Sequence, residues 1–274
     1  MYLGIDIGGT KTLVAVLSKA GKVVESAKFP TPEKYSNFLL ELAHTVHHLE
    51  HREFQAAAVA APGRIDHKRG VVLDLGNLPW HNEQVQADCE KIVKCPVVLE
   101  NDAKLAGLGE ALLHPDAQTA LYVTVSTGIG TGVVRDGRLD ATLSNMEGGH
   151  MLLPFKGKLT KWESFASGKA IYNHFGKKAV DIHDEASWRY VARNLAPGFF
   201  QMIAIVQPDL IIIGGSIGSY FDRYGAYLEE ELNKLEVPMV PIPRIVQAQR
   251  PEEAVIYGCH ALIEQTFPHH AASA

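Results

Sequence analysis

Cysteine is scarce in this chain. The 274 residues contain three, Cys89, Cys95 and Cys259. The number is odd and no two of them form a CxxC pair, which excludes a disulfide scaffold and a structural zinc site built from thiolates. This cysteine content is typical of a protein kept in a reducing compartment.

Long apolar runs and strong charge are missing as well. The strongest apolar run, residues 210–213, is far too short to cross a bilayer. The first twenty residues include Asp6, Lys11 and Lys19, so they do not match a signal peptide. The formal net charge is −5 and no cluster of Lys and Arg stands out. We therefore expect a cytoplasmic protein that binds neither membranes nor nucleic acid.

The remaining composition is that of a globular protein, with 46% hydrophobic and 21% charged residues. A length of 274 residues favours two lobes over one. Strand-like and helix-like segments alternate, which predicts an α/β fold. The predicted strands are 2–7, 12–17, 23 onward, 56–61, 96–99, 121–126, 209–213 and 242–247. The predicted helices are one starting with Thr31 as its cap, then 83–93, 103–113, 163–175, 185–206, 220–235 and 254–266, with a polar segment at 154–161.

One pattern occurs twice, roughly 120 residues apart. In each copy a strand is followed by a Gly/Thr turn, a returning strand and a second glycine turn. The second copy ends in Asp136-Gly137, a hairpin signal. This repeat predicts two related lobes, each with a glycine turn of the size that binds phosphate.

The first glycine turn is a candidate phosphate site. It contains Gly8, Gly9, Thr10 and Lys11, whose backbone N–H groups, hydroxyl and ammonium suit phosphate oxygens. Asp6 lies inside the preceding apolar strand, where an unpaired carboxylate is costly. We therefore expect Asp6 to have a role, such as holding Mg²⁺, beyond what a plain hairpin turn requires.

Two further glycine segments are candidates for the nucleotide. The run from Thr127 and Gly128 to Gly132 looks like a dinucleotide fingerprint, but it leads into Val133-Val134, a strand, where that fingerprint needs a helix. We reject that interpretation and predict a second phosphate-binding hairpin. The pair Gly214-Gly215 ends a buried strand and suits the base or ribose side of a nucleotide.

Asp102 is the candidate catalytic base. It follows Glu100 and Asn101 at the C-terminal end of a predicted strand, where α/β proteins place ligand-binding groups. Such a carboxylate can take the proton of an attacking hydroxyl. The alternative is that Asp102 caps the following helix. Asn101 and Asp102 cannot both be the cap, so one of them remains for chemistry.

Glu147, His150 and Glu163 are candidates for binding sugar hydroxyls, which carboxylates and histidine hold in pairs. Glu147 and His150 lie close together in a glycine-bent loop. The alternative is an ordinary surface Glu and His.

Taken in order, these segments resemble the ROK family of repressors, open reading frames and sugar kinases, in the actin-like ATPase superfamily. The resemblance rests on Gly4–Lys11, Ala61-Pro62-Gly63, Asn77-Leu78-Pro79-Trp80, Glu100-Asn101-Asp102-Ala103, Thr127–Gly132, Glu147–His150, Glu163 with Ser167-Gly168, and Pro208-Asp209 before Gly214-Gly215. Each motif is weak by itself, whereas the ordered set is specific.

The resemblance implies two actin-like (ribonuclease H-like) α/β lobes with a cleft between them. We assign residues 1–113 with the terminal segment 254–274 to one lobe and 114–253 to the other. It also implies that Asp102 activates a sugar 6-hydroxyl and that Gly63, Asn101, Glu147, His150 and Glu163 bind the sugar. The implied phosphate-side residues are Asp6, Gly8, Gly9, Thr10, Lys11, Thr127 and Gly128. A homodimer is the implied assembly.

The chain departs from the family pattern at one place. Most members carry a CxCGxxGCxE zinc motif after the histidine, and residues 151–162 contain no cysteine. We therefore expect no zinc site and leave His150 as a sugar contact. The sequence Glu147-Gly148-Gly149-His150 resembles that of the zinc-free glucokinases.

We predict an ATP- and Mg²⁺-dependent hexose kinase with glucose as the default substrate. Alternatives are a polyphosphate-dependent glucokinase, an N-acetylhexosamine kinase and a non-catalytic sugar-binding regulator. A regulator would carry a helix-turn-helix before the first strand, which here begins at Tyr2. A phosphatase of the superfamily is disfavoured because water as acceptor needs no sugar-binding residues.

Overall fold

A computed structural model describes residues 1–76, 78–250 and 253–267. The chain divides into two compact units, Met1–Gly109 with Glu252–Ala274, and Glu110–Pro251. The domain boundaries predicted at 113 and 253 stay a prediction. Asn77 of the quoted Asn-Leu-Pro-Trp motif and the end of the predicted terminal segment, 268–274, lie outside the described residues.

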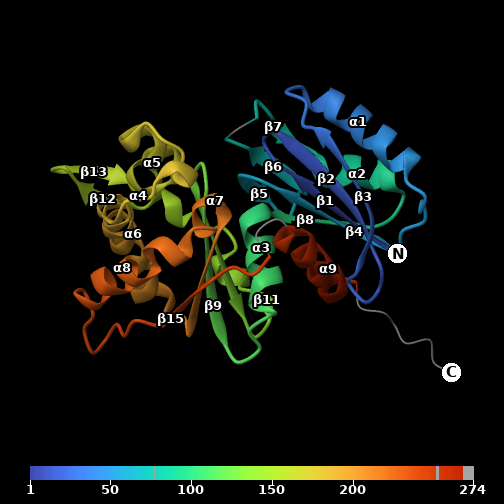
Figure 1. The fold of residues 1–274 in the computed structure, drawn as a ribbon. Helices are drawn as coiled ribbons and strands as arrows, with labels where there is room; N and C mark the ends of the chain where they lie inside the picture. Colours follow the sequence, from blue (N-terminus) through green and yellow to red (C-terminus); the bar gives the residue numbers. More distant parts are fainter. Residues whose placement is uncertain (77, 251–252, 268–274) are drawn as a thin grey trace. The chain divides into compact units, whose positions relative to one another are not determined.

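The first unit is built on a five-stranded sheet of order β3-β2-β1-β4-β8 (Figure 1). Its strands are β1 (Tyr2–Ile7), β2 (Lys11–Leu17), β3 (Val23–Pro30), β4 (Ala56–Ala61) and β8 (Val97–Asn101). The first three run antiparallel as a meander, and β1, β4 and β8 are parallel. The C-terminal ends of three parallel strands therefore lie at one edge of the sheet, the edge that carries Asp6 and Asn101.

Side chains alternate between the two faces of this sheet. Leu3, Ile5 and Ile7 pack with α1 (Tyr35–His48) and α2 (Val85–Val93). The small residues Ala56, Ala58 and Ala60 face α9 (Ala254–Thr266) and α3 (Asp102–Ala111). A separate small sheet contains β5 (Arg64–Asp66), β6 (Val71–Asp74) and β7 (His81–Glu83).

Helices α3 and α9 touch backbone to backbone. A Cβ on Gly258 of α9 would lie 1.9 Å from the Leu105 carbonyl oxygen, and one on Gly109 of α3 would lie 2.2 Å from the Ala254 carbonyl oxygen. Neither position tolerates a side chain without separating the helices. The helix that begins with Asp102 is thus held directly against the helix that covers this face of the sheet.

The second unit has the same plan, with order β11-β10-β9-β14-β15. Its strands are β9 (Thr119–Val125), β10 (Ile129–Arg135), β11 (Arg138–Leu139), β14 (Leu210–Gly214) and β15 (Arg244–Gln247). Its helices are α4 (Trp162–Ala166), α5 (Gly168–Phe175), α6 (Glu185–Val206), α7 (Gly215–Gly218) and α8 (Phe221–Asn233). The hairpin of β12 (Leu152–Phe155) and β13 (Lys158–Lys161) completes it, with short 3₁₀ turns at Ala141–Leu143, Gly148–His150 and Ala179–Asp181.

The internal repeat is confirmed by the two strand orders. In both units three antiparallel strands are followed by two parallel ones. Three residues, 8–10, separate β1 from β2, and three residues, 126–128, separate β9 from β10. The turn Asp136-Gly137 is also confirmed, since both residues have the positive φ, 50° and 71°, of a tight hairpin.

Two local predictions are wrong. Helix α1 begins at Tyr35 rather than after Thr31, because the Thr31 hydroxyl donates to the Gly8 carbonyl at 2.7 Å. The second glycine turn ends at Gly128, because Gly130, Thr131 and Gly132 pair along β9. The segment 154–161, predicted only as polar, belongs to the β12–β13 hairpin, whose turn Lys156-Gly157 has φ of 49° and 76°.

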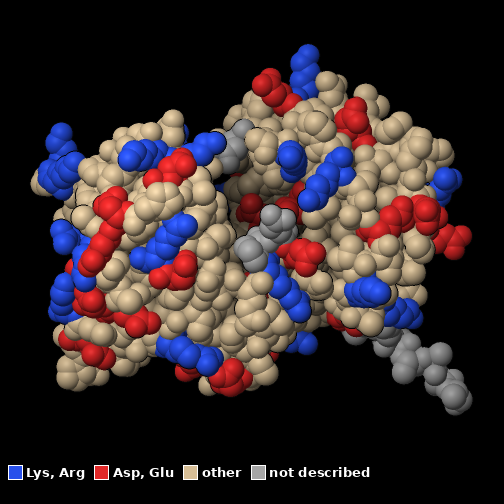
Figure 2. Space-filling view, in the orientation of Figure 1, with Lys and Arg blue, Asp and Glu red and all other residues tan. Residues whose placement is uncertain are grey.

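Charged side chains of both signs are interspersed on the face shown in Figure 2. On α6 and α8, Arg189 lies 2.6 Å from Glu185 and 2.7 Å from Glu230, and Lys234 lies 2.8 Å from Glu231. Among the described residues, the helices are all too short or too polar to cross a membrane. All three cysteines are buried.

Candidate functional site

The first glycine turn is held from outside by β3 and the segment that follows it. The Gly8 N–H donates to the Lys11 carbonyl at 3.0 Å, and the Thr31 N–H donates to the Thr10 carbonyl at 3.0 Å. A Cβ on Gly8 would lie 2.7 Å from the Lys11 oxygen, so the turn needs glycine there. Because the Thr31 contacts fix its outer side, the turn is ordered as a candidate phosphate site before any ligand binds.

Asp6 lies on the α9 face of β1. Gly4, two residues earlier on the same face, would place a Cβ 3.3 Å from Ile256. Burial, and after it the negative charge of Asp102, raise the pKa of Asp6 to about 7. The structure therefore brings Asp6 and Asp102, 96 positions apart in the sequence (102 − 6), close enough to repel each other. Two neighbouring buried carboxylates favour a bound cation.

The turn from β8 into α3 separates the roles of three adjacent polar residues. Asn101 Oδ1 accepts the Lys104 N–H at 3.2 Å, so Asn101 is the helix cap. Glu100 Oε1 accepts the Asn101 N–H at 2.7 Å. Asp102 Oδ1 accepts the Ala103 N–H at 2.8 Å, and burial raises the pKa of its carboxyl group. The cap is supplied without Asp102, which leaves its carboxylate for chemistry.

Gly63 and His67 flank β5 and both contact this turn. Asn101 Nδ2 donates to the Gly63 carbonyl at 3.1 Å. Gly63 has φ of +83°, and a Cβ there would lie 1.9 Å from the Asp74 oxygen, so only glycine fits. His67 Nε2 lies 3.0 Å from Glu100 Oε2. His67 was missed in the sequence analysis. Its partner Glu100 lies 33 residues further along the chain, and no local pattern indicates a contact at that separation.

The second glycine turn is tied to two neighbouring segments. The Ser126 N–H donates to the Gly128 carbonyl at 2.9 Å, and the Gly168 N–H donates to the Ser126 carbonyl at 2.6 Å. Ser126 Oγ accepts the Ser216 N–H at 3.0 Å. The first turn of α7 and the start of α5 therefore meet at this turn.

The structure brings His150 and Glu163 together. His150 Nε2 lies 3.3 Å from Glu163 Oε1. Glu163 Oε2 accepts the Ile129 N–H at 3.4 Å and would lie 2.8 Å from a Cβ on Gly128. The predicted sugar-binding pair is thus packed against the predicted phosphate turn.

The β12–β13 hairpin explains how this pair forms without a zinc loop. Leu152 pairs with Lys161, and the Trp162 N–H donates to the Met151 carbonyl at 2.8 Å. Pairing of the two strands returns the chain to its starting point, so residue 163 comes back to residue 150. Glu147 precedes the 3₁₀ turn Gly148–His150, which is anchored by the Gly148 N–H donating to Thr131 Oγ1 at 3.1 Å. No group of three or more metal-ligating side chains occurs among the residues described.

A cavity of about 390 Å³ opens beside the second glycine turn. Apolar and aromatic side chains, Val180, Ile217, Tyr172 and Tyr220, line part of it, and Lys169, Lys178, Ser126, Thr127 and Ser216 line the rest. Gly214 and Gly215 do not line it but directly precede Ser216, which does. A Cβ on Gly214 would overlap Tyr122 Oη at 2.2 Å, and Gly215 has φ of +81°. Both positions need glycine for packing and backbone conformation.

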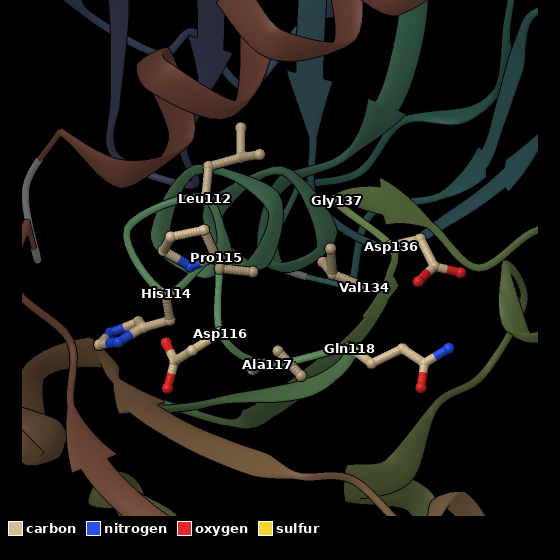
Figure 3. Close-up of a pocket in the computed structure, with 11 residues that line it drawn as sticks. Leu112, His114, Pro115, Asp116, Ala117, Gln118, Val134, Asp136 and Gly137 are labelled. Atoms are coloured by element: carbon tan, nitrogen blue, oxygen red, sulfur yellow. The ribbon is translucent and has the colours of Figure 1, made fainter.

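A second cavity of about 400 Å³ lies at the end of α3 (Figure 3). Leu112, Pro115, Asp116 and Gln118 line it together with the β10–β11 turn. None of the predicted site residues borders it, so it contributes nothing to the candidate site.

Comparison with known proteins identifies the family. The ROK family profile matches residues 2–266. The chain belongs to the ROK family. The predicted α/β fold with two actin-like units is confirmed by its structural neighbours.

The relatives of this ROK chain include sugar kinases. It is 24% identical to a glucokinase of Streptomyces coelicolor (98% of this chain, 99% of the relative) and 27% identical to an N-acetyl-D-glucosamine kinase of Salmonella typhimurium (94% and 97%). The crystal structure of an inorganic polyphosphate/ATP-glucomannokinase from Arthrobacter sp. strain KM is 30% identical, with a TM-score of 0.73 over 97% of this chain and 98% of that one.

Proposed function

We propose that this protein is a sugar kinase that transfers a phosphoryl group from ATP to the 6-hydroxyl of a hexose, with glucose the first substrate to test. The observation that carries the proposal is the division of roles at the β8–α3 turn. Asn101 caps the helix and Glu100 is bound by its neighbours, whereas the Asp102 carboxylate is needed for neither task.

In the proposed reaction Asp102 is the catalytic base. The sugar hydroxyl gives its proton to the Asp102 carboxylate, its oxygen bonds to the γ-phosphorus, and the bond from that phosphorus to ADP breaks. General-base catalysis of this kind contributes roughly 10²–10⁴ in rate. The rest of the rate enhancement comes from positioning and from neutralising the charge on the transferred group. A pKa raised by burial makes Asp102 a stronger base than an exposed aspartate.

Asp6 is the residue that would hold Mg²⁺. Its carboxylate is buried, and the only charge identified as acting on its pKa within the described residues is the like charge of Asp102. A hard cation with oxygen ligands fits that site. When bound, Mg²⁺ would supply positive charge that neutralises the donor phosphates.

The donor is proposed to bind in the cavity beside the second glycine turn. Val180, Ile217 and Tyr172 form an apolar and aromatic wall that suits a purine base, and Lys169 and Lys178 supply positive charge for phosphates. Polyphosphate has no purine ring, so it gains no binding energy from the apolar wall. This lining favours ATP, and polyphosphate remains the alternative donor because lysines bind either chain of phosphates.

The residues proposed to bind the sugar are Glu147, His150, Glu163, Gly63 and Asn101. The His150–Glu163 contact presents a donor and an acceptor side by side, as a pair of sugar hydroxyls requires. Glu163 also contacts the Gly128 turn, which is proposed to bind phosphate. An N-acetylhexosamine is the alternative acceptor.

The test is ADP release measured with glucose, mannose, fructose, N-acetylglucosamine and N-acetylmannosamine, with ATP and, by product analysis, with polyphosphate. We expect turnover with ATP and at least one sugar, and absence of turnover with every pair would refute the proposal. Asp102→Asn should lower kcat at least about 100-fold while sugar binding by calorimetry and thermal stability are retained. Asp136→Asn is the matched control, since Asp136 lies on an exposed hairpin whose positive φ suits asparagine.

A further inference from the structure

His67 is a titratable side chain that the proposed reaction does not use. It lies in the turn between β5 and β6, and its Nε2 is 3.0 Å from Glu100 Oε2. The His67 side chain is 34% exposed and the Glu100 side chain 10%. The contact joins the segment after β5 to strand β8 of the five-stranded sheet. Glu100 lies near the end of β8, two residues before Asp102.

Glu100 is bound at both oxygens. Oε1 accepts the Asn101 N–H at 2.7 Å, and Oε2 faces His67. A buried carboxylate with one partner removed is left with an uncompensated charge, which is costly. The conformation of Glu100 therefore depends on His67, and through the Asn101 N–H so does the backbone that leads into Asp102.

The contact is one of two that fasten β5 to the β8–α3 turn. At the start of β5, Asn101 Nδ2 donates to the Gly63 carbonyl at 3.1 Å. Just after its end, His67 meets Glu100. The two bonds hold both ends of a three-residue strand against one turn. The His67–Glu100 pair differs from an exposed surface ion pair, which contributes little, because Glu100 is buried and lies two residues before the proposed catalytic base.

The charged groups around His67 come from three elements. Glu100 of β8 stabilises the protonated ring, Lys104 of α3 opposes it, and Asp66 of β5 supports it. The Glu100 bond has the largest effect, so the pKa of His67 is raised above its usual value. The protonated ring, which holds Glu100 most firmly, therefore persists to higher pH than that of an ordinary histidine and is lost as the pH rises further.

We infer that His67 is a positioning residue for phosphoryl transfer: through Glu100 it holds the β8–α3 turn so that the Asp102 carboxylate stays in place for the sugar hydroxyl. The inference rests on the proposed kinase function. It assigns His67 no contact with either substrate, so loss of His67 should act on kcat rather than on binding.

The test compares His67→Ala and His67→Gln with Lys68→Ala, an exposed neighbour in the same turn, as matched control. We expect His67→Ala to lower kcat about tenfold with the KM for sugar and for ATP changed less than about twofold. Glutamine keeps an N–H donor without the charge. His67→Gln should therefore retain at least about a third of wild-type kcat at pH 7 and lose the alkaline fall in kcat that wild type shows, whereas Lys68→Ala keeps that fall.

A double-mutant cycle tests the route through Glu100. Glu100→Gln combined with His67→Ala should lose no more activity than the more damaging single variant. If the two losses multiply, His67 does not act through Glu100 and the inference is wrong. It is equally overturned if His67→Ala matches Lys68→Ala in kcat, or if His67→Gln keeps the wild-type alkaline profile, a comparison that holds even where the alanine variant folds poorly.

Failure of the kinase proposal has a different signature. In that case wild type phosphorylates no sugar with either donor, and both ideas fall together. An active wild type with unaffected His67 variants overturns the positioning role alone.

Discussion

Glu110 offers a sharp test of how the segment after β15 is held in the second unit. It lies in the last turn of α3 and is 0% exposed. Its Oε1 accepts the Arg250 N–H at 2.6 Å and its Oε2 accepts the Gln249 N–H at 2.8 Å. A single carboxylate thus satisfies two backbone N–H groups of the segment after β15. Replacement by alanine removes both of these acceptors.

The magnitude follows from the two bonds. A hydrogen bond to a charged group contributes about 1.5–3 kcal/mol, so we expect Glu110→Ala to lower the free energy of unfolding by about 3–5 kcal/mol. For a protein of this size each kcal/mol shifts the melting temperature by about 2–4 °C, which gives a fall of about 10 °C. Glu110→Gln keeps one acceptor and turns an amide donor toward the other N–H. Its free energy of unfolding should therefore lie between those of wild type and Glu110→Ala.

The measurement is calorimetric and urea unfolding of wild type, Glu110→Ala, Glu110→Gln and Glu229→Ala. Glu229 is exposed on α8 and serves as the matched control, with an expected change within about 0.5 kcal/mol. If Glu110→Ala unfolds within about 1 kcal/mol of wild type, the two bonds do not stabilise the fold and the reasoning is refuted.

Three further outcomes are expected. Gly198→Ala should lower the free energy of unfolding by about 1–3 kcal/mol in urea, because its Cβ would lie 2.0 Å from the Trp162 ring; an unchanged midpoint would contradict this packing. The acid limb of kcat should lie above the usual pKa of an aspartate, about 4, because burial raises the pKa of Asp102 and the base works only when ionised; a limb at pH 4 or below would contradict it. A zinc-specific chelator should leave the melting temperature unchanged, since paired strands order 152–161; a fall of several degrees would show a bound metal.

Much of the fold was predictable from local patterns. Strands such as β1 and β4 are short apolar runs that end at glycine or proline, and helix α6 shows sustained helical spacing. The repeat of strand, glycine turn and strand was visible because the turn residues are unusual. These signals depend on residues close together in sequence, which a single chain displays directly.

The failures have in common that a distant partner decides the local structure. Thr31 looked like a helix cap, but Gly8 uses its hydroxyl. Gly130 and Gly132 looked like turn residues, but pairing with β9 extends the strand through them. His67 gave no signal, since only the folded sheet places it beside Glu100. The roles assigned to Asp102, Glu147 and the other site residues stay predictions until they are measured.

The buried cysteines have a practical consequence. Burial raises the pKa of Cys89 to about 12 and that of Cys95 to about 11, and Cys259 is raised as well. At neutral pH the native thiols should therefore be inert toward maleimides, and a cysteine introduced at an exposed lysine would be labelled selectively without removing any of them. Lys28 of the first unit and Lys177 of the second are exposed. Fluorophores at these two positions would report the distance between the units with and without sugar.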